Sequence, residues 1–253
     1  MTSFGKRVAW VTGGGSGIGE AGAEALAADG WTVMVSGRRQ DALNSVVAKI
    51  ASTGGQADAI ALDVSKAQDV NKAAQQILAK HGRIDLLVNS AGINVPKRSW
   101  ADMEIEGWDK LVEINLNGVL YCMRAVLPAM RAQQDGCIIN VASWAGRHVS
   151  KMPGPAYTAT KHAVLALTHS FNMDECVNGL RACCLSPGEV ATPILKMRPV
   201  VPSEKEQARM LQAEDLGRII AFVASMPPRV CMNEILVSPT WNGSFVAMAH
   251  HNG

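Results

Sequence analysis

Residues 7–19 read RVAWVTGGGSGIG, and this stretch decides the fold because a short apolar run leads directly into a glycine-rich turn. The alanine-rich residues 20–29 follow with helical spacing, and Gly30 ends them as a C-cap would. In such an order of strand, turn and helix, a pyrophosphate can approach the amides at the helix N-terminus. A flexible glycine loop is the alternative, but it does not explain the flanking strand and helix. We therefore predict a dinucleotide site formed by Gly13, Ser16, Gly17, Ile18 and Gly19.

Short apolar runs alternate with helical patterns along the rest of the chain, as is typical of a doubly wound α/β fold with a parallel sheet. Strands are expected at residues 7–12, 32–36, 57–62, 84–88, 137–141, 180–186 and 234–237. Helices are expected at residues 20–29, 40–53, 66–80, 104–132, 155–175 and 215–225, and Pro128 should kink or end the fourth of them.

No repeat or linker divides the chain, so we expect a single domain over residues 1–253. Its cofactor half should cover about residues 1–140, and its catalytic and substrate half about 141–253. The polar, proline-rich residues 189–214 predict a mobile flap within the second half. Because 48% of the residues are hydrophobic and only 5% aromatic, the core should consist mainly of Ala, Val, Ile, Leu and Met.

The charge and cysteine patterns narrow the function classes. A net charge of +2 with interspersed signs, and no basic run, favours a small-molecule substrate and argues against nucleic acid as a partner. The six cysteines include no CxxC pair and no zinc-finger spacing with histidine, so we expect buried thiols and no metal site. Neither a signal peptide nor a membrane span is predicted, which indicates a cytoplasmic protein.

The end of the second predicted strand indicates which cofactor is bound. Gly37-Arg38-Arg39 stands where an acidic residue would accept hydrogen bonds from the ribose hydroxyls of NAD. Two guanidinium groups instead suit a 2′-phosphate, so the sequence predicts NADP(H) in preference to NAD(H). The alternative is that Arg38 and Arg39 are solvated residues at the start of a helix.

The stretch Tyr157-Thr158-Ala159-Thr160-Lys161 places a phenol and an ammonium one helical turn apart on the same face. A tyrosine is a poor acid or base near neutral pH unless a cation stabilises its phenolate, and Lys161 could be that cation. The YxxxK spacing alone also fits an ordinary amphipathic helix. It becomes informative because the glycine turn of residues 13–19 occurs in the same chain.

Taken together, these motifs resemble the short-chain dehydrogenase/reductase family, in its single-domain branch, over nearly the whole chain. The matching motifs are Thr12-Gly13-x-x-x-Gly17-x-Gly19, Asp63, Asn89-Ser90-Ala91-Gly92 with Ser90 in place of the usual Asn, the tetrad of Asn115, Ser143, Tyr157 and Lys161, and Pro187-Gly188 with Thr192. The resemblance implies a Rossmann-type fold with seven parallel strands in the order 3-2-1-4-5-6-7. It also implies a homotetramer, with a dimer as the alternative, joined through helices 104–132 and 155–175.

The resemblance also implies roles for these residues. Tyr157 would be the general acid in reduction and the base in oxidation, Ser143 would polarise the substrate oxygen, and Lys161 would lower the pKa of Tyr157 and bind the nicotinamide ribose. Asn115 would anchor a water that leads protons outward. The cofactor would further be contacted by Asp63, Val64, Asn89, Ala91, Gly92, Tyr157, Lys161, Pro187, Gly188, Val190 and Thr192.

The expected function is an NADP(H)-dependent interconversion of a ketone or aldehyde and an alcohol. Three other functions have different sequence signatures. A sugar-nucleotide epimerase would have another glycine spacing and a longer chain, and an enoyl reductase would have a wider spacing between tyrosine and lysine. A non-catalytic NADP-binding regulator predicts a degraded tetrad, whereas all four residues are present.

The substrate is left open between two classes. Lys97, Arg98, Lys196 and Arg198 lie in loops at the expected site edge and could bind the anion of a 3-oxo acid, a 3-hydroxy acid or an acyl thioester. The run of residues 227–240 is also weakly similar to the ends of NADP-dependent 3-hydroxy-acid dehydrogenases. Alternatively, the cations are solvated, and a neutral ketone binds among Met103, Ile194, Leu195, Met197 and Met210.

Overall fold

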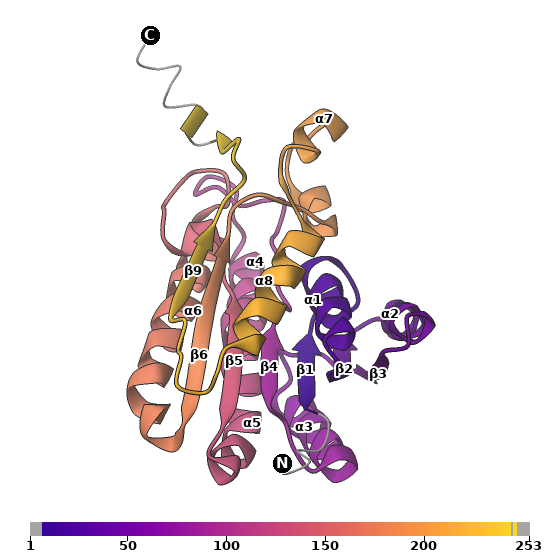
Figure 1. Cartoon of the computed structure of the whole chain (residues 1–253). Helices are drawn as coiled ribbons and strands as arrows, with labels where there is room; N and C mark the ends of the chain where they lie inside the picture. The colour runs from indigo at the N-terminus through magenta and orange to yellow at the C-terminus, as the bar shows by residue number, and fades with distance from the viewer. Residues whose placement is uncertain (1–6, 244, 247–253) are drawn as a thin grey trace.

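Each apolar run that predicts a strand forms part of one parallel sheet in the computed structural model, which describes residues 7–243 and 245–246 (Figure 1). The sheet has the order β3-β2-β1-β4-β5-β6-β9, so the seven-stranded Rossmann-type prediction is confirmed. Its strands are β1 Val8–Thr12, β2 Thr32–Gly37, β3 Gln56–Ala61, β4 Leu86–Asn89, β5 Gly136–Val141, β6 Leu180–Pro187 and β9 Glu234–Val237. Residues 1–6, 244 and 247–253, which the one-domain prediction also covers, lie outside the described residues.

Helices cover both faces of the sheet (Figure 1). On one face, α1 Gly17–Ala28, α2 Gln40–Ser52 and α8 Ala213–Ser225 contribute side chains to one buried cluster. On the other face, α3 Ala67–His81, α5 Gly118–Gln133 and α6 Pro155–Glu175 contribute to a second cluster. This arrangement leaves the carboxyl ends of the parallel strands as the edge where a ligand binds in such folds.

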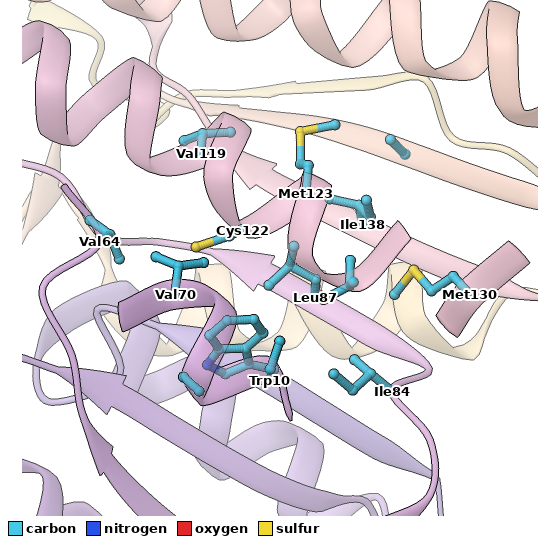
Figure 2. Close-up of a cluster of buried hydrophobic side chains, with 14 of the residues drawn as sticks. Trp10, Val64, Val70, Ile84, Leu87, Val119, Cys122, Met123, Met130 and Ile138 are labelled. Atoms are coloured by element: carbon cyan, nitrogen blue, oxygen red, sulfur yellow. The ribbon is translucent and has the colours of Figure 1, made fainter. Parts of the chain in front are cut away.

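The two clusters arise from the alternation of side chains along each strand. In β1, Val8 and Trp10 face the cluster beneath α3 and α5, whereas Ala9 and Val11 face the cluster beneath α1. Trp10 is fully buried among aliphatic side chains in Figure 2, and its indole nitrogen donates to the Ser36 hydroxyl at 2.9 Å. The core otherwise consists mainly of aliphatic side chains, as the composition predicts.

The helix predicted over residues 104–132 is interrupted, and this corrects the prediction. It consists of α4 Ile105–Val112, a π-helical turn Glu113–Asn117 and α5. Pro128 lies inside α5, which continues past it to Gln133. The π turn contains the buried Asn115, and π turns of this kind occur often at functional sites.

Two other predictions meet a mixed outcome. All six cysteines are free thiols, but Cys176 and Cys231 are exposed because they lie at the end of α6 and in the loop before β9, outside the sheet. The segment 189–214 contains β7 Val190–Ala191, a 3₁₀ turn Pro193–Met197, α7 Glu204–Gln207 and β8 Leu211–Gln212, with β7 paired to β8. The motion of this segment stays a prediction.

Within the described part of the chain, no helix has the length and hydropathy needed to cross a membrane.

Candidate active site

The glycine turn after β1 has the shape that a pyrophosphate requires. Gly13 has φ +65°, and a Cβ placed on it would lie 2.7 Å from the backbone nitrogen of Ala91. A Cβ on Gly19 would overlap the carbonyl oxygen of Gly13. Ser16 precedes α1 in extended conformation without a side-chain capping bond, so its hydroxyl does not satisfy the first amides of the helix. The turn therefore fits the phosphates of a dinucleotide.

Arg38 and Arg39 are exposed immediately after β2, at the side of the site where the adenosine is expected. Asp63 lies nearby, since the charge of Arg38 helps to lower the pKa of its carboxyl. Burial alone would raise that pKa, but hydrogen bonds from the Ser65 amide at 3.0 Å and hydroxyl at 2.8 Å, with the charges of Arg38 and Lys66, outweigh it. Asp63 thus caps a turn and also presents a carboxylate beside Arg38.

The segment after β4 connects the glycine turn to β5. The Thr12 hydroxyl lies 3.4 Å both from the carbonyl of Val88, to which it donates, and from the amide of Ala91, from which it accepts. Asn89 donates from its side chain to Asn140 on β5, at 2.9 Å. The side chain of Asn89 therefore holds the neighbouring strands β4 and β5 together.

Lys161, Asn115 and Gly92 come together between the glycine turn and α6. A Cβ placed on Gly92 would lie 3.5 Å from the side-chain oxygen of Asn115 and 3.7 Å from the Lys161 ammonium. The Lys161 Nζ is buried and donates to the carbonyl of Val141 at 2.9 Å. Burial lowers its pKa to about 8. Both ends of the Asn115 amide are bonded to the backbone of Ile93, each at 2.9 Å.

Tyr157 lies on the first turn of α6, and several neighbouring groups act on its phenol. Burial raises the pKa of its phenol, while a hydrogen bond with Ser143 and the charges of Arg98 and Arg198 lower it. The Lys161 Nζ lies 5.6 Å from the centroid of the Tyr157 ring and donates to a backbone carbonyl. Two arginines in loops thus add positive charge near the phenol, and the lowering of its pKa by Lys161 stays a prediction.

The segment after β6 reaches back to the glycine turn. The amide of Gly188, just beyond Pro187, donates to Val237 at 2.7 Å, and Val190 is buried in β7. A Cβ placed on Gly17 would lie 3.2 Å from the Thr192 methyl group. The structure therefore brings Thr192 and the glycine turn together, and the contact of Thr192 with the cofactor stays a prediction.

The four loop cations predicted to converge do not all do so. Lys97 is exposed and forms an ion pair with Glu104, and Lys196 is also exposed. Arg98 is buried and Arg198 is partly buried, and only these two act on the Tyr157 phenol. Consecutive residues in an extended loop point in opposite directions, so Lys97 and Arg98 have different environments.

The apolar residues proposed to line a pocket for a neutral ketone also differ in their exposure. Leu195 is buried, Ile194 and Met197 are exposed, and Met103 and Met210 are partly buried.

Two elements of the site were missed in the sequence. The carbonyl of Val141 holds Lys161, and a backbone acceptor has no sequence signal. Trp144, next to Ser143, stacks on His148 with ring centroids 4.4 Å apart and meets the edge of Phe245 at 5.8 Å. The aromatic residue directly after Ser143 is the sequence signal that could have pointed to this cluster.

Comparison with known proteins identifies the family. The family of short chain dehydrogenases matches residues 7–200. An uncharacterized oxidoreductase of Staphylococcus aureus strain MRSA252 is 32% identical over 239 residues, which is 94% of this chain and all of the relative. An alcohol dehydrogenase of the archaeon Thermococcus sibiricus, complexed with 5-hydroxy-NADP, superposes with a TM-score of 0.84 at 27% identity over 94% of this chain and 98% of its own.

A second solved structure supports the same assignment. A metagenomic short-chain oxidoreductase in complex with NADP superposes with a TM-score of 0.81 at 31% identity, over 93% of this chain and 98% of its own. The glycine turn, the parallel sheet and the cluster of Ser143, Tyr157 and Lys161 agree with these matches. The chain is an oxidoreductase that belongs to the short-chain dehydrogenase/reductase family.

Proposed function

We propose that this protein interconverts a ketone or aldehyde and an alcohol with NADP(H), and that Tyr157 is the general acid and base. The observation that supports this best is the hydrogen bond between Ser143 and Tyr157. Lys161, one turn further along the same helix as Tyr157, lies against Gly92. The test is NADPH consumption by the purified protein over a panel of oxo acids, acyl thioesters, aldehydes and simple ketones. Absence of turnover on every carbonyl would contradict the proposal.

The residues divide the work of reduction between them. NADPH, when bound, supplies the hydride that the carbonyl carbon receives. Tyr157 donates its phenolic proton to the carbonyl oxygen, and Ser143 donates a hydrogen bond to the same oxygen as charge develops on it. The charges of Arg98 and Arg198 stabilise the phenolate that remains on Tyr157.

Lys161 and Asn115 support this arrangement from behind. Lys161 is fixed by Val141 and lies where the nicotinamide ribose is expected, next to Gly92. The Asn115 side chain holds Ile93 through one amide N–H and through its oxygen, which leaves its second N–H and an oxygen lone pair for a proton-conducting water.

NADP(H) rather than NAD(H) is proposed as the cofactor. The similar structures from Thermococcus sibiricus and from the metagenome hold NADP-type cofactors. In this chain, Arg38 is exposed beside Asp63 and forms no ion pair or hydrogen bond with any described residue, so its guanidinium is available for a 2′-phosphate.

Arg38→Ala is expected to weaken NADPH binding by about ten- to a hundredfold, because loss of a charge-assisted bond costs about 1.5–3 kcal/mol. NADH binding should change much less, since NADH lacks the 2′-phosphate. Fluorescence titration with both cofactors measures the two constants. Arg218→Ala, at an exposed position of α8, is the matched control. Equal losses for NADPH and NADH would contradict the assignment of Arg38.

The remaining expectations belong to the same proposal. A homotetramer through the helices of residues 104–132 and 155–175 is supported by exposed apolar side chains there, among them Ile105 at 67% and Met173 at 80% exposure. Free thiols at all six cysteines suit a reducing cytoplasm. The division into a cofactor half and a catalytic half fits the place of the glycine turn before residue 140 and of Tyr157 after it.

A non-catalytic regulator is the function of another class. It would have no need for Ser143 to be bonded to Tyr157, or for a buried ammonium at Lys161. The assembled tetrad therefore favours the enzyme.

A further inference from the structure

A buried guanidinium lies beside the catalytic phenol and has an incomplete set of partners. Arg98 is only 7% exposed, in the loop between β4 and α4. One terminal nitrogen donates to the backbone carbonyl of Met197, in the 3₁₀ turn of the flap. Its Nε is buried and has no hydrogen-bond partner among the described residues, and no described carboxylate forms an ion pair with it. Burial of a charge with so little compensation is costly, so it needs an explanation.

The position of Arg98 is fixed relative to Tyr157 by the backbone. The Asn94 side chain donates to the carbonyl of Pro153 at 3.1 Å and accepts from the Val95 amide at 2.8 Å. Gly154, with φ +81°, packs so closely on the carbonyl of Arg98 that a Cβ there would collide with it. Since Gly154 directly precedes α6, the loop that carries Arg98 is attached to the start of the helix that carries Tyr157.

The charges around this position leave an excess of positive charge. Arg198 forms an ion pair with Glu189 at 3.0 Å, so its charge is matched. Arg98 is close enough to Arg198 that, after burial, the charge of Arg198 also lowers the pKa of the Arg98 guanidinium. Arg98 and Arg198, the two cations near the Tyr157 phenol, are therefore balanced by the single carboxylate of Glu189. An anion bound there would gain from a low-dielectric environment and from a buried donor that lacks a partner.

We propose that Arg98 binds the carboxylate of the substrate, so that the enzyme reduces small oxo acids and oxidises the corresponding hydroxy acids. This inference rests on the proposed function of Tyr157 and narrows its substrate class. A carboxylate accepts from the free Nε–H of Arg98 and takes the place of the missing counter-charge. The neighbouring Lys97, exposed and paired with Glu104, takes no part.

The test compares each acid with its neutral amide of nearly the same shape. The pairs are pyruvate and pyruvamide, acetoacetate and acetoacetamide, and 4-oxopentanoate and its amide. For the best pair, the wild-type kcat/KM is expected to favour the acid by about ten- to a hundredfold, as a charge-assisted bond provides. This preference should decrease as salt is added, because salt screens the attraction.

Arg98→Gln should abolish most of the preference, since the glutamine side chain carries no charge. The amide rate should fall by a smaller factor than the acid rate. Arg98→Lys should retain part of the preference, and Lys97→Gln is the matched control that should retain all of it. Circular dichroism establishes that each variant is folded. As a readout without turnover, calorimetry on the NADP⁺-loaded protein should show tighter binding of butanoate than of butanamide, and loss of that difference in Arg98→Gln.

Other outcomes would overturn the inference in distinguishable ways. Equal losses for acid and amide in Arg98→Gln would show that Arg98 only supports the loop or the Tyr157 phenol. Turnover of neutral ketones without any preference for acids would remove the carboxylate role and leave the carbonyl reductase intact. No turnover of any carbonyl, with no difference between butanoate and butanamide, would overturn the inference together with the proposed function.

Discussion

Tyr157→Phe is expected to lower kcat for carbonyl reduction by about 10²–10⁴-fold, the contribution typical of a general acid. The substitution removes the proton that passes to the substrate oxygen but retains the ring. The dissociation constant for NADPH should change little, because the glycine turn and Arg38 are unaffected. Stopped-flow turnover and fluorescence titration measure the two quantities.

The chain offers a matched control for this substitution. Tyr121 on α5 is the other of the two tyrosines, and it packs against the buried cluster around Trp10. Tyr121→Phe should retain nearly all of the wild-type kcat. If Tyr157→Phe also retained a substantial fraction of kcat, the proton donor would have to be another group.

Lys161→Met is expected to lower kcat and to weaken NADPH binding as well, since the ammonium lies next to Gly92, one of the residues proposed to contact the cofactor. This combined loss separates Lys161 from Tyr157, whose replacement affects kcat alone. Lys72→Met, at an exposed position of α3, is the matched control. A Lys161→Met variant with unchanged NADPH affinity would contradict the ribose contact.

The same substitution should change how stability depends on pH. Burial lowers the pKa of Lys161 from 10.5 to about 8, so between these pH values the unfolded chain holds a proton that the folded chain lacks. The wild-type free energy of unfolding therefore gains about 1.4 kcal/mol per pH unit from this group, or about 3 kcal/mol in all, relative to Lys161→Met. Below pH 8 the cost of burying the charge is fully present.

Urea unfolding of both proteins at pH 7, 8, 9 and 10 measures this difference. Comparison with the variant cancels other groups that titrate in the same range. A difference in free energy that stays constant over the series would show that Lys161 carries its charge without cost in the folded state.

The features that the sequence could predict are local ones. The run of residues 7–19 specifies strand, turn and helix by itself, because only glycine tolerates the contacts of Gly13 with Ala91 and of Gly19 with Gly13. The alternation of apolar strands and helices predicted a parallel α/β sheet, and the resemblance to a family supplied the order of its seven strands. Spacing and residue type singled out Tyr157 and Lys161, whereas Ser143, Asn115 and the roles of all four residues came from the resemblance.

What the sequence could not predict depends on contacts between distant segments. The π turn at Asn115 adds one residue to a helical turn, and its apolar pattern still resembles a continuous helix. Lys97 and Arg98 are adjacent basic residues, and the sequence does not distinguish their environments. Only the packing of Gly154 on the loop shows that Arg98 is the buried one. The bond of Lys161 to the Val141 carbonyl is also a tertiary contact.

Transfer of a label tests the central claim most directly. A ketone or oxo acid that the protein turns over is reduced with NADPH deuterated at the transferable position, and the alcohol is analysed by mass spectrometry and NMR. The account predicts one deuterium on the carbinol carbon, and an oxygen-bound proton that comes from solvent through Tyr157. An alcohol without deuterium at that carbon, formed while NADPH is consumed, would contradict hydride transfer to the carbonyl and with it the proposed reaction.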